Sequence, residues 1–125
     1  MPGIHKIATV TIAVKDQDEA LVWFTEKLGF ETRRDISLPG TRWLTVAPPG
    51  QKEVDFLLAS WFPEKIGMNA TCVVETDDCQ KTYKELVGRG VRFTQEPQER
   101  PYGVEAVFKD PWGNSYALVG RASTR

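Results

Sequence analysis

Few side chains in this sequence can act as metal ligands or nucleophiles. The chain has 125 residues, one histidine (His5) and two cysteines (Cys72 and Cys79). One chain cannot supply a site that needs two histidines, which excludes most mononuclear zinc and non-haem iron arrangements. The cysteines form no CxxC pair and are too few for a disulfide framework. We therefore expect a reduced, cytoplasmic chain in which His5 is an ordinary residue at the rim of a sheet.

The charge and composition exclude several classes of partner. There are 16 basic and 17 acidic residues, which gives a formal net charge of −1. This balance provides no basic field for binding nucleic acid or an anionic membrane. A hydrophobic content of 41% with mixed charges is typical of a folded chain. Residues 1–6 show no apolar signal segment, and no apolar stretch is long enough to span a bilayer.

Two halves of the sequence resemble each other at an offset of 61 residues. Residues 7–14 alternate like a strand, and residues 16–19 (DQDE) are typical of the acidic cap that begins a helix. At the same offset, residues 70–75 are again strand-like and residues 77–80 (DDCQ) repeat the cap. Gly29 and Gly90 stand where each helix is expected to end. This self-similarity predicts two copies of one supersecondary unit.

Three β-rich segments follow each predicted helix. They lie near residues 30–34, 42–47 and 54–59 in the first half, and near 91–94, 104–109 and 115–119 in the second. The pattern predicts an α+β fold with two βαβββ modules, at about 4–60 and 68–121. Residues 61–67 would connect them. Because a half of about 60 residues buries little surface by itself, we predict one domain over residues 4–122.

Four motifs carry a resemblance to a known family. They are residues 14–16 (VKD), 27–30 (KLGF), 89–91 (RGV) and 108–114 (FKDPWGN). In this order and spacing the chain resembles the vicinal oxygen chelate superfamily, which includes glyoxalase I, bleomycin-resistance proteins and extradiol dioxygenases. The resemblance covers residues 7–119. It implies a mixed sheet curled around a concave cavity, with the helices on the convex side, and a homodimer.

The resemblance also implies where metal ligands would stand. Counting from the two helix caps and the final turn places these positions at Thr9, Phe56, Ala70 and Ala117. Only Thr9 has a donor atom, and a threonine is a weak ligand. A shift of one residue would bring in Thr71 or Asp55, which still supplies no histidine. We therefore predict no metal and no cofactor.

Strand alternation predicts which side chains line the cavity. Leu44, Val46, Ala106 and Phe108 suit the core. The predicted lining is mostly small or apolar and consists of Thr9, Thr11, Ala13, Trp43, Thr45, Val54, Phe56, Leu58, Ala70, Cys72, Glu105, Val107, Ser115, Ala117 and Val119. Such a surface is typical of a pocket for an aromatic or amphipathic small molecule.

The predicted ligand-binding residues are Trp43, Phe56, Glu105, Tyr102, Thr9 and Trp61. Each has a purely structural alternative. Trp43 and Phe56 could fill the cavity as core, and Tyr102 could pack on the surface. Glu105 could be solvated, or could pair with Arg42 or Arg100. Trp61 and Phe62 could gate the cavity or pack between subunits.

These observations predict metal-independent binding of a small apolar, aromatic or cationic molecule. The alternative is a glyoxalase- or dioxygenase-like enzyme that uses a non-standard metal site, or Glu105 and Tyr102 as acid and base. A third hypothesis is an interaction module that acts only through its dimer interface.

Overall fold

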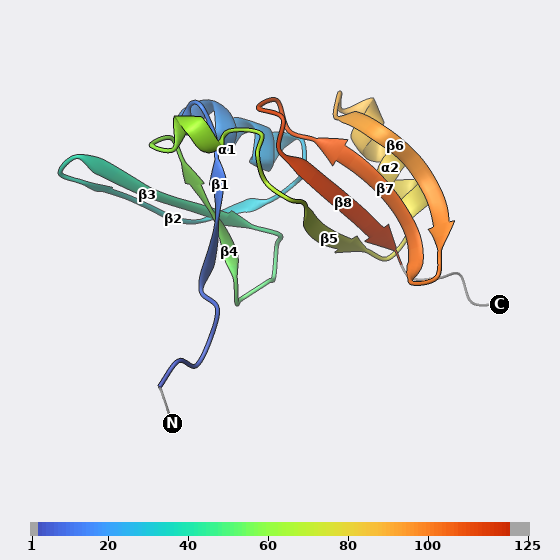
Figure 1. The fold of residues 1–125 in the computed structure, drawn as a ribbon, viewed down its shortest axis with the longest axis horizontal. Helices are drawn as coiled ribbons and strands as arrows, with labels where there is room; N and C mark the ends of the chain where they lie inside the picture. Colours follow the sequence, from blue (N-terminus) through green and yellow to red (C-terminus); the bar gives the residue numbers. More distant parts are fainter. Residues whose placement is uncertain (1–2, 121–125) are drawn as a thin grey trace. The chain divides into compact units, whose positions relative to one another are not determined.

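The computed structural model describes residues 3–120 and contains two compact units, one ending at Pro63 and the other starting at Glu64. Each unit has strands and a helix in the order β-α-β-β-β (Figure 1). The predicted α+β class with two βαβββ modules is confirmed, and we call the units module 1 and module 2. Residues 121 and 122, at the end of the predicted domain, lie outside the described residues.

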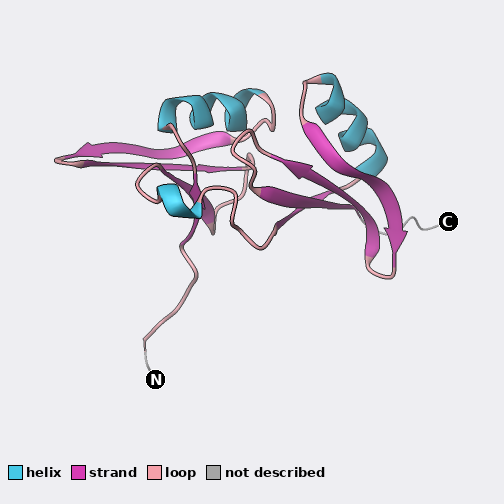
Figure 2. Cartoon of the chain, turned by 45° about the horizontal axis from the view of Figure 1, so that its top comes forward, coloured by secondary structure: helices cyan, strands magenta, loops and turns pink. Residues whose placement is uncertain are grey.

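Module 1 is a four-stranded mixed sheet with one helix. Its elements are β1 (Thr9–Ala13), α1 (Gln17–Glu26), β2 (Glu31–Leu38), β3 (Thr41–Ala47) and β4 (Asp55–Ala59). The strand order is β1-β4-β3-β2; β1 and β4 are parallel, and the other neighbours are antiparallel. Helix α1 lies along one face of the sheet (Figure 2). We call the opposite surface of each sheet the helix-free face.

Module 2 repeats this arrangement after a short 3-10 helix, η1 (Pro63–Lys65). It contains β5 (Cys72–Thr76), α2 (Cys79–Gly88), β6 (Arg92–Arg100), β7 (Gly103–Lys109) and β8 (Ser115–Gly120). The strand order is β5-β8-β7-β6, with β5 and β8 parallel. The same connectivity in both modules places equivalent strands in equivalent positions.

An acidic side chain begins each helix. Asp16 accepts a hydrogen bond from the backbone N of Glu19 at 2.8 Å, and Asp78 accepts one from the backbone N of Lys81 at 3.1 Å. Both caps satisfy backbone donors that a helix leaves free at its start. The caps stand 62 residues apart, so the predicted offset of 61 and the predicted cap at Asp77 are wrong. Neither helix in the described part of the chain is long and apolar enough to cross a bilayer.

Aromatic rings fill the space between α1 and its sheet. Phe24 of α1 is fully buried, and its ring centroid lies 5.7 Å from that of Phe30 and 6.2 Å from that of Phe56 in β4. The buried side chains beside them include Ile12, Leu44, Val46 and Leu58. Burying apolar groups of this size supplies most of the driving force for folding the module.

Module 2 has a corresponding aromatic core. Tyr83 of α2 packs edge-on against Phe93, Phe93 contacts Phe108, and Phe108 stacks on Tyr116 with centroids 5.1 Å apart. The phenol of Tyr116 donates a hydrogen bond to the carboxylate of Asp110 at 2.8 Å. The core of module 2 is thus joined directly to the turn at residues 110–114.

Three charged side chains join α1 to the β2–β3 hairpin. The guanidinium of Arg42 donates to both carboxylate oxygens of Asp35, at 2.8 and 2.9 Å, and to Asp18 of α1 at 2.7 Å. These hydrogen bonds lower the pKa of Asp35 and raise that of Arg42. Because Arg42 reaches α1, its position in β3 faces the helix, as do Leu44 and Val46.

This group predicts an acid-sensitive part of the stability. A carboxyl with a lowered pKa stabilises the fold above its unfolded pKa of about 3.9, and this contribution is lost as the pH falls through the folded pKa. We expect urea unfolding between about pH 6 and pH 2.5 to show a steeper loss for the wild type than for Arg42→Met. The difference should stay below about 1 kcal/mol, since the pair is partly exposed. Arg34→Met is the control and should keep the wild-type slope; parallel profiles for wild type and Arg42→Met would contradict the prediction.

Candidate functional site

The helix-free face of module 1 carries the predicted side chains of β1 and β3. Trp43 and Thr45 alternate with the buried Leu44 and Val46, and they point away from α1 as predicted. Thr9, Thr11 and Ala13 share this face because they alternate with the buried Ile12. Strand β4 lies between β1 and β3, so Thr9 and Trp43 are not neighbours.

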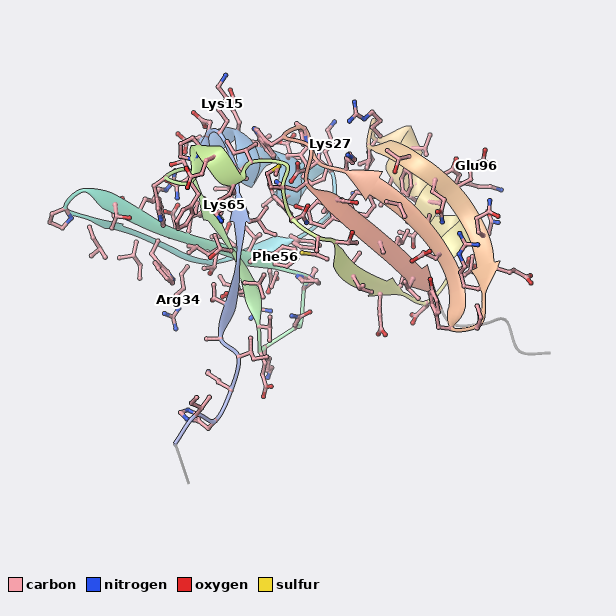
Figure 3. All side chains as sticks on the ribbon, in the orientation of Figure 1. Lys15, Lys27, Arg34, Phe56, Lys65 and Glu96 are labelled. Atoms are coloured by element: carbon pink, nitrogen blue, oxygen red, sulfur yellow. The ribbon has the colours of Figure 1, made fainter. Side chains whose placement is uncertain are left out.

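The predicted orientation of Phe56 is wrong. Its ring lies 6.2 Å from those of both Phe24 and Phe30, on the side of the sheet that α1 covers (Figure 3). Phe56 pairs with Val46 of β3, and side chains of directly paired residues lie on one face. Phe56 and Leu58 therefore belong to the core, which was the structural alternative for Phe56. Asp55, Leu57 and Ala59 face the other way.

The error arises from the lengths of the connections. Seven residues separate β3 from β4, whereas five separate β7 from β8. Phe56 is therefore equivalent to Tyr116, 60 residues later, while the helix caps differ by 62. An odd offset of 61 exchanges the two faces of a strand, because side chains alternate with a period of two.

The corrected register changes the predicted metal positions. The position in β4 equivalent to Ala117 is Leu57 rather than Phe56, and the threonine equivalent to Thr9 is Thr71 rather than Ala70. The hydroxyl of Thr9 donates a hydrogen bond to the carboxylate of Asp55, its neighbour on β4. Residues 3–120 contain no group of three or more His, Cys, Asp or Glu side chains arranged to hold a metal ion.

Cys72 also faces opposite to its predicted direction. It pairs with Tyr116, whose side chain lies in the core of module 2. Burial raises the pKa of the Cys72 thiol, and burial likewise raises that of Cys79 at the start of α2. Both cysteines are therefore poor nucleophiles at neutral pH.

Acidic side chains flank the helix-free face of module 2. Glu75 of β5, Val119 of β8 and Glu105 of β7 form one cross-strand row. The carboxylates stand on strands two apart, with Cα atoms about 10 Å from each other. Glu105 accepts a hydrogen bond from Arg100 at 3.4 Å, which confirms the ion-pair alternative for this residue.

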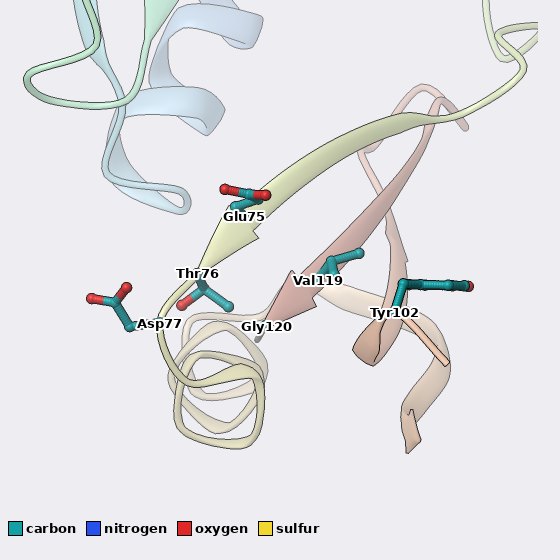
Figure 4. A pocket seen from close by; sticks show the side chains of 6 residues that line it. All are labelled: Glu75, Thr76, Asp77, Tyr102, Val119 and Gly120. Atoms are coloured by element: carbon teal, nitrogen blue, oxygen red, sulfur yellow. The ribbon is translucent and has the colours of Figure 1, made fainter. Parts of the chain in front are cut away.

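A pocket of about 440 Å³ lies at the end of this row. It is lined by Glu75, Thr76, Asp77, Tyr102, Val119 and Gly120 (Figure 4). Gly120 lets β8 approach the start of α2, since a Cβ atom there would lie 2.9 Å from the backbone N of Cys79. Of the predicted ligand-binding residues, Tyr102 lines the pocket, and Glu105 pairs with its Val119.

Sequence reasoning missed Glu75 and Asp77. The residue pattern did contain a signal for Glu75: with the offset of 62, it is equivalent to Ala13, which was assigned correctly to the helix-free face. Asp77 was instead interpreted as the helix cap, a role that Asp78 has.

Two further residues from the sequence analysis lie apart from the pocket. Trp61 follows β4, is 41% exposed, and has its ring 6.0 Å from that of Phe62. His5 precedes β1 and is exposed, with Nδ1 3.3 Å from the carbonyl of Gly3. Neither contributes to the lining of the pocket in module 2.

The fold and its final turn can now be compared with known proteins. The model of the Glyoxalase/Bleomycin resistance protein/Dioxygenase superfamily matches residues 6–118. The chain belongs to this superfamily. Within it, the chain is 38% identical over 125 residues to the uncharacterized protein YurT of Bacillus subtilis (strain 168), covering 91% of this chain and 98% of that protein.

Solved structures of superfamily members show the same likeness. The crystal structure of TnmS3, an antibiotic binding protein from Streptomyces sp. CB03234, matches with a TM-score of 0.86 and 30% identity, covering 98% of this chain and 100% of that chain. The crystal structure of UcmS2 matches with a TM-score of 0.83 and 38% identity, covering 93% and 98% respectively.

Proposed function

We propose that this protein binds a small, positively charged aromatic or apolar molecule, without a metal ion, in the pocket of module 2. The observation that carries the proposal is the set of side chains around that pocket: two exposed carboxylates, Glu75 and Asp77, and the exposed ring of Tyr102. A volume of about 440 Å³ suits a drug-sized molecule. The likeness to an antibiotic binding protein supports a small-molecule ligand.

The charge preference follows from the ion pairs of module 2. Within residues 3–120, neither Glu75 nor Asp77 forms an ion pair, whereas Glu105 is paired with Arg100. The first two carboxylates therefore remain available to a ligand cation. The ring of Tyr102 is 60% exposed and offers an electron-rich face to the same charge.

We extend the proposal to the molecule as a whole. One domain over residues 4–122, a homodimer and a cytoplasmic location fit the superfamily and the paucity of cysteines. Sedimentation equilibrium at micromolar concentration should give twice the monomer mass of 14.1 kDa. A monomer mass over the whole concentration range would remove the dimer from the proposal.

Calorimetry with two naphthalene probes of similar size and opposite charge tests the ligand preference. We expect 2-naphthylmethylammonium to bind in the pocket, and Glu75→Gln with Asp77→Asn to weaken it about tenfold, since each partly exposed ion pair contributes about 0.5–1 kcal/mol. Tyr102→Ala should weaken it about three- to fivefold by removing a cation–π contact.

Glu96→Gln is the matched control for this experiment. Glu96 is an exposed carboxylate of β6 outside the pocket (Figure 3). Its substitution changes the net charge in the same direction as Glu75→Gln and should leave the affinity of the cationic probe unchanged. An equal loss in the control, or no saturable binding of the cation, would overturn the proposal.

A further inference from the structure

The hydroxyl of Thr45 is an unpaired polar group inside module 1. Thr45 lies in the middle of β3, its side chain is 0% exposed, and its Oγ1 has no hydrogen-bond partner among residues 3–120. Buried side-chain hydroxyls almost always have a partner. This exception therefore indicates that a group from outside the described chain completes the hydrogen bond.

The surroundings of this hydroxyl are aromatic and apolar. Thr45 pairs with Leu57 of β4 on one side and with Arg34 of β2 on the other. Trp43, two residues earlier in β3, shares the face and pairs with Ile36, which is 46% exposed. The hydroxyl thus lies at the base of a surface bounded by an indole ring, two aliphatic side chains and one guanidinium group.

Arg34 adds an available positive charge to this surface. Its side chain is exposed and extends away from α1 (Figure 3). Within the described residues it forms no ion pair, whereas Arg33 and Arg42 do. The carboxylate on the far side of the face, Asp55, accepts a hydrogen bond from Thr9. Rotation of the exposed Arg34 side chain would open a path to the hydroxyl beneath it.

We propose that the helix-free face of module 1 is a second binding site, which takes a planar aromatic anion. The ring lies on Trp43, and an oxygen of the anion accepts hydrogen bonds from the Thr45 hydroxyl and the Arg34 guanidinium. A guanidinium matches the planar geometry of a carboxylate, and these charge-assisted bonds are the stronger kind. The proposal goes beyond the pocket of module 2, which has the opposite charge preference.

Titration with 2-naphthoate, followed by Trp fluorescence and calorimetry, tests this site. Thr45→Val keeps the shape of the side chain but removes the hydroxyl. We expect it to weaken 2-naphthoate binding five- to tenfold while the melting temperature stays the same or rises, because an unpaired buried group has been removed. Arg34→Gln should weaken the same probe by a similar factor.

Two controls separate this site from the pocket of module 2. Arg92→Gln removes an exposed arginine of β6 and should leave 2-naphthoate binding unchanged. Glu75→Gln should affect only the cationic probe, and Thr45→Val only the anionic one, so either site can fail independently. The inference is overturned if 2-naphthoate does not bind, if Thr45→Val leaves its affinity unchanged, or if that variant loses stability.

Discussion

Replacing Asp110 with alanine should lower the free energy of unfolding by about 3–5 kcal/mol, the largest effect of any single charged residue that we predict. Asp110 is 2% exposed and its carboxylate accepts four hydrogen bonds. The donors are the backbone N of Trp112, the backbone N and the side-chain amide of Asn114, and the phenol of Tyr116, at 2.8–2.9 Å.

The physical reason is the number of donors that the substitution would leave unpaired. Asn114 and Tyr116 are almost completely buried, so water cannot readily replace the carboxylate. The turn would also release Gly67, whose backbone N donates to the side-chain oxygen of Asn114 at 3.1 Å. We therefore expect the loss to extend from the turn to the segment that precedes β5.

Urea unfolding followed by circular dichroism measures this effect. Asp77→Ala, at an exposed aspartate, is the control and should change the free energy of unfolding by less than about 0.5 kcal/mol. Tyr116→Phe removes one of the four donors and should cost about 1–2 kcal/mol. If Asp110→Ala were as stable as the control, the turn would not depend on this carboxylate.

Phe56→Ala should cost about 2–4 kcal/mol, because it removes a ring from the aromatic core beneath α1. The ring of Phe56 contacts two others, Phe24 and Phe30, and the cavity left behind would be lined by these rings. The predicted loss depends on the corrected orientation, since a ring on an open face would contribute much less.

The same unfolding measurement distinguishes the two orientations. Tyr102→Ala removes an aromatic ring that is 60% exposed and should cost less than about 1 kcal/mol. Phe56→Leu, which fills most of the space, should recover at least half of the loss seen for alanine. A cost for Phe56→Ala no greater than that for Tyr102→Ala would place the ring outside the core.

Much of the fold could be predicted because its signals are local. Alternation identified the strands, acidic caps identified the helices, and residues 108–114 identified the final turn and the superfamily. The assignment of Trp43 and Thr45 to one face, with Leu44 and Val46 on the other, depends only on counting within one strand.

The candidate site was harder to predict because it depends on pairing between strands. Phe56 and Cys72 were placed by carrying positions from one half to the other, and an error of one residue exchanged their faces. A second obstacle is Val54, which has a φ of 54° just before β4. A β-branched residue seldom adopts this conformation, so the residue type gives no sign of the bend there.

The unequal loops before β4 and β8 also bear on how such a chain can change during evolution. The two loops differ by two residues, an even number, so every strand of one module keeps the facing of its counterpart in the other. A change of one residue that passed into the strand would turn Phe56 or Tyr116 outward and expose the core. After a duplication, the halves of such a chain are therefore expected to drift in length by pairs of residues at these loops, and surviving relatives should show the same parity.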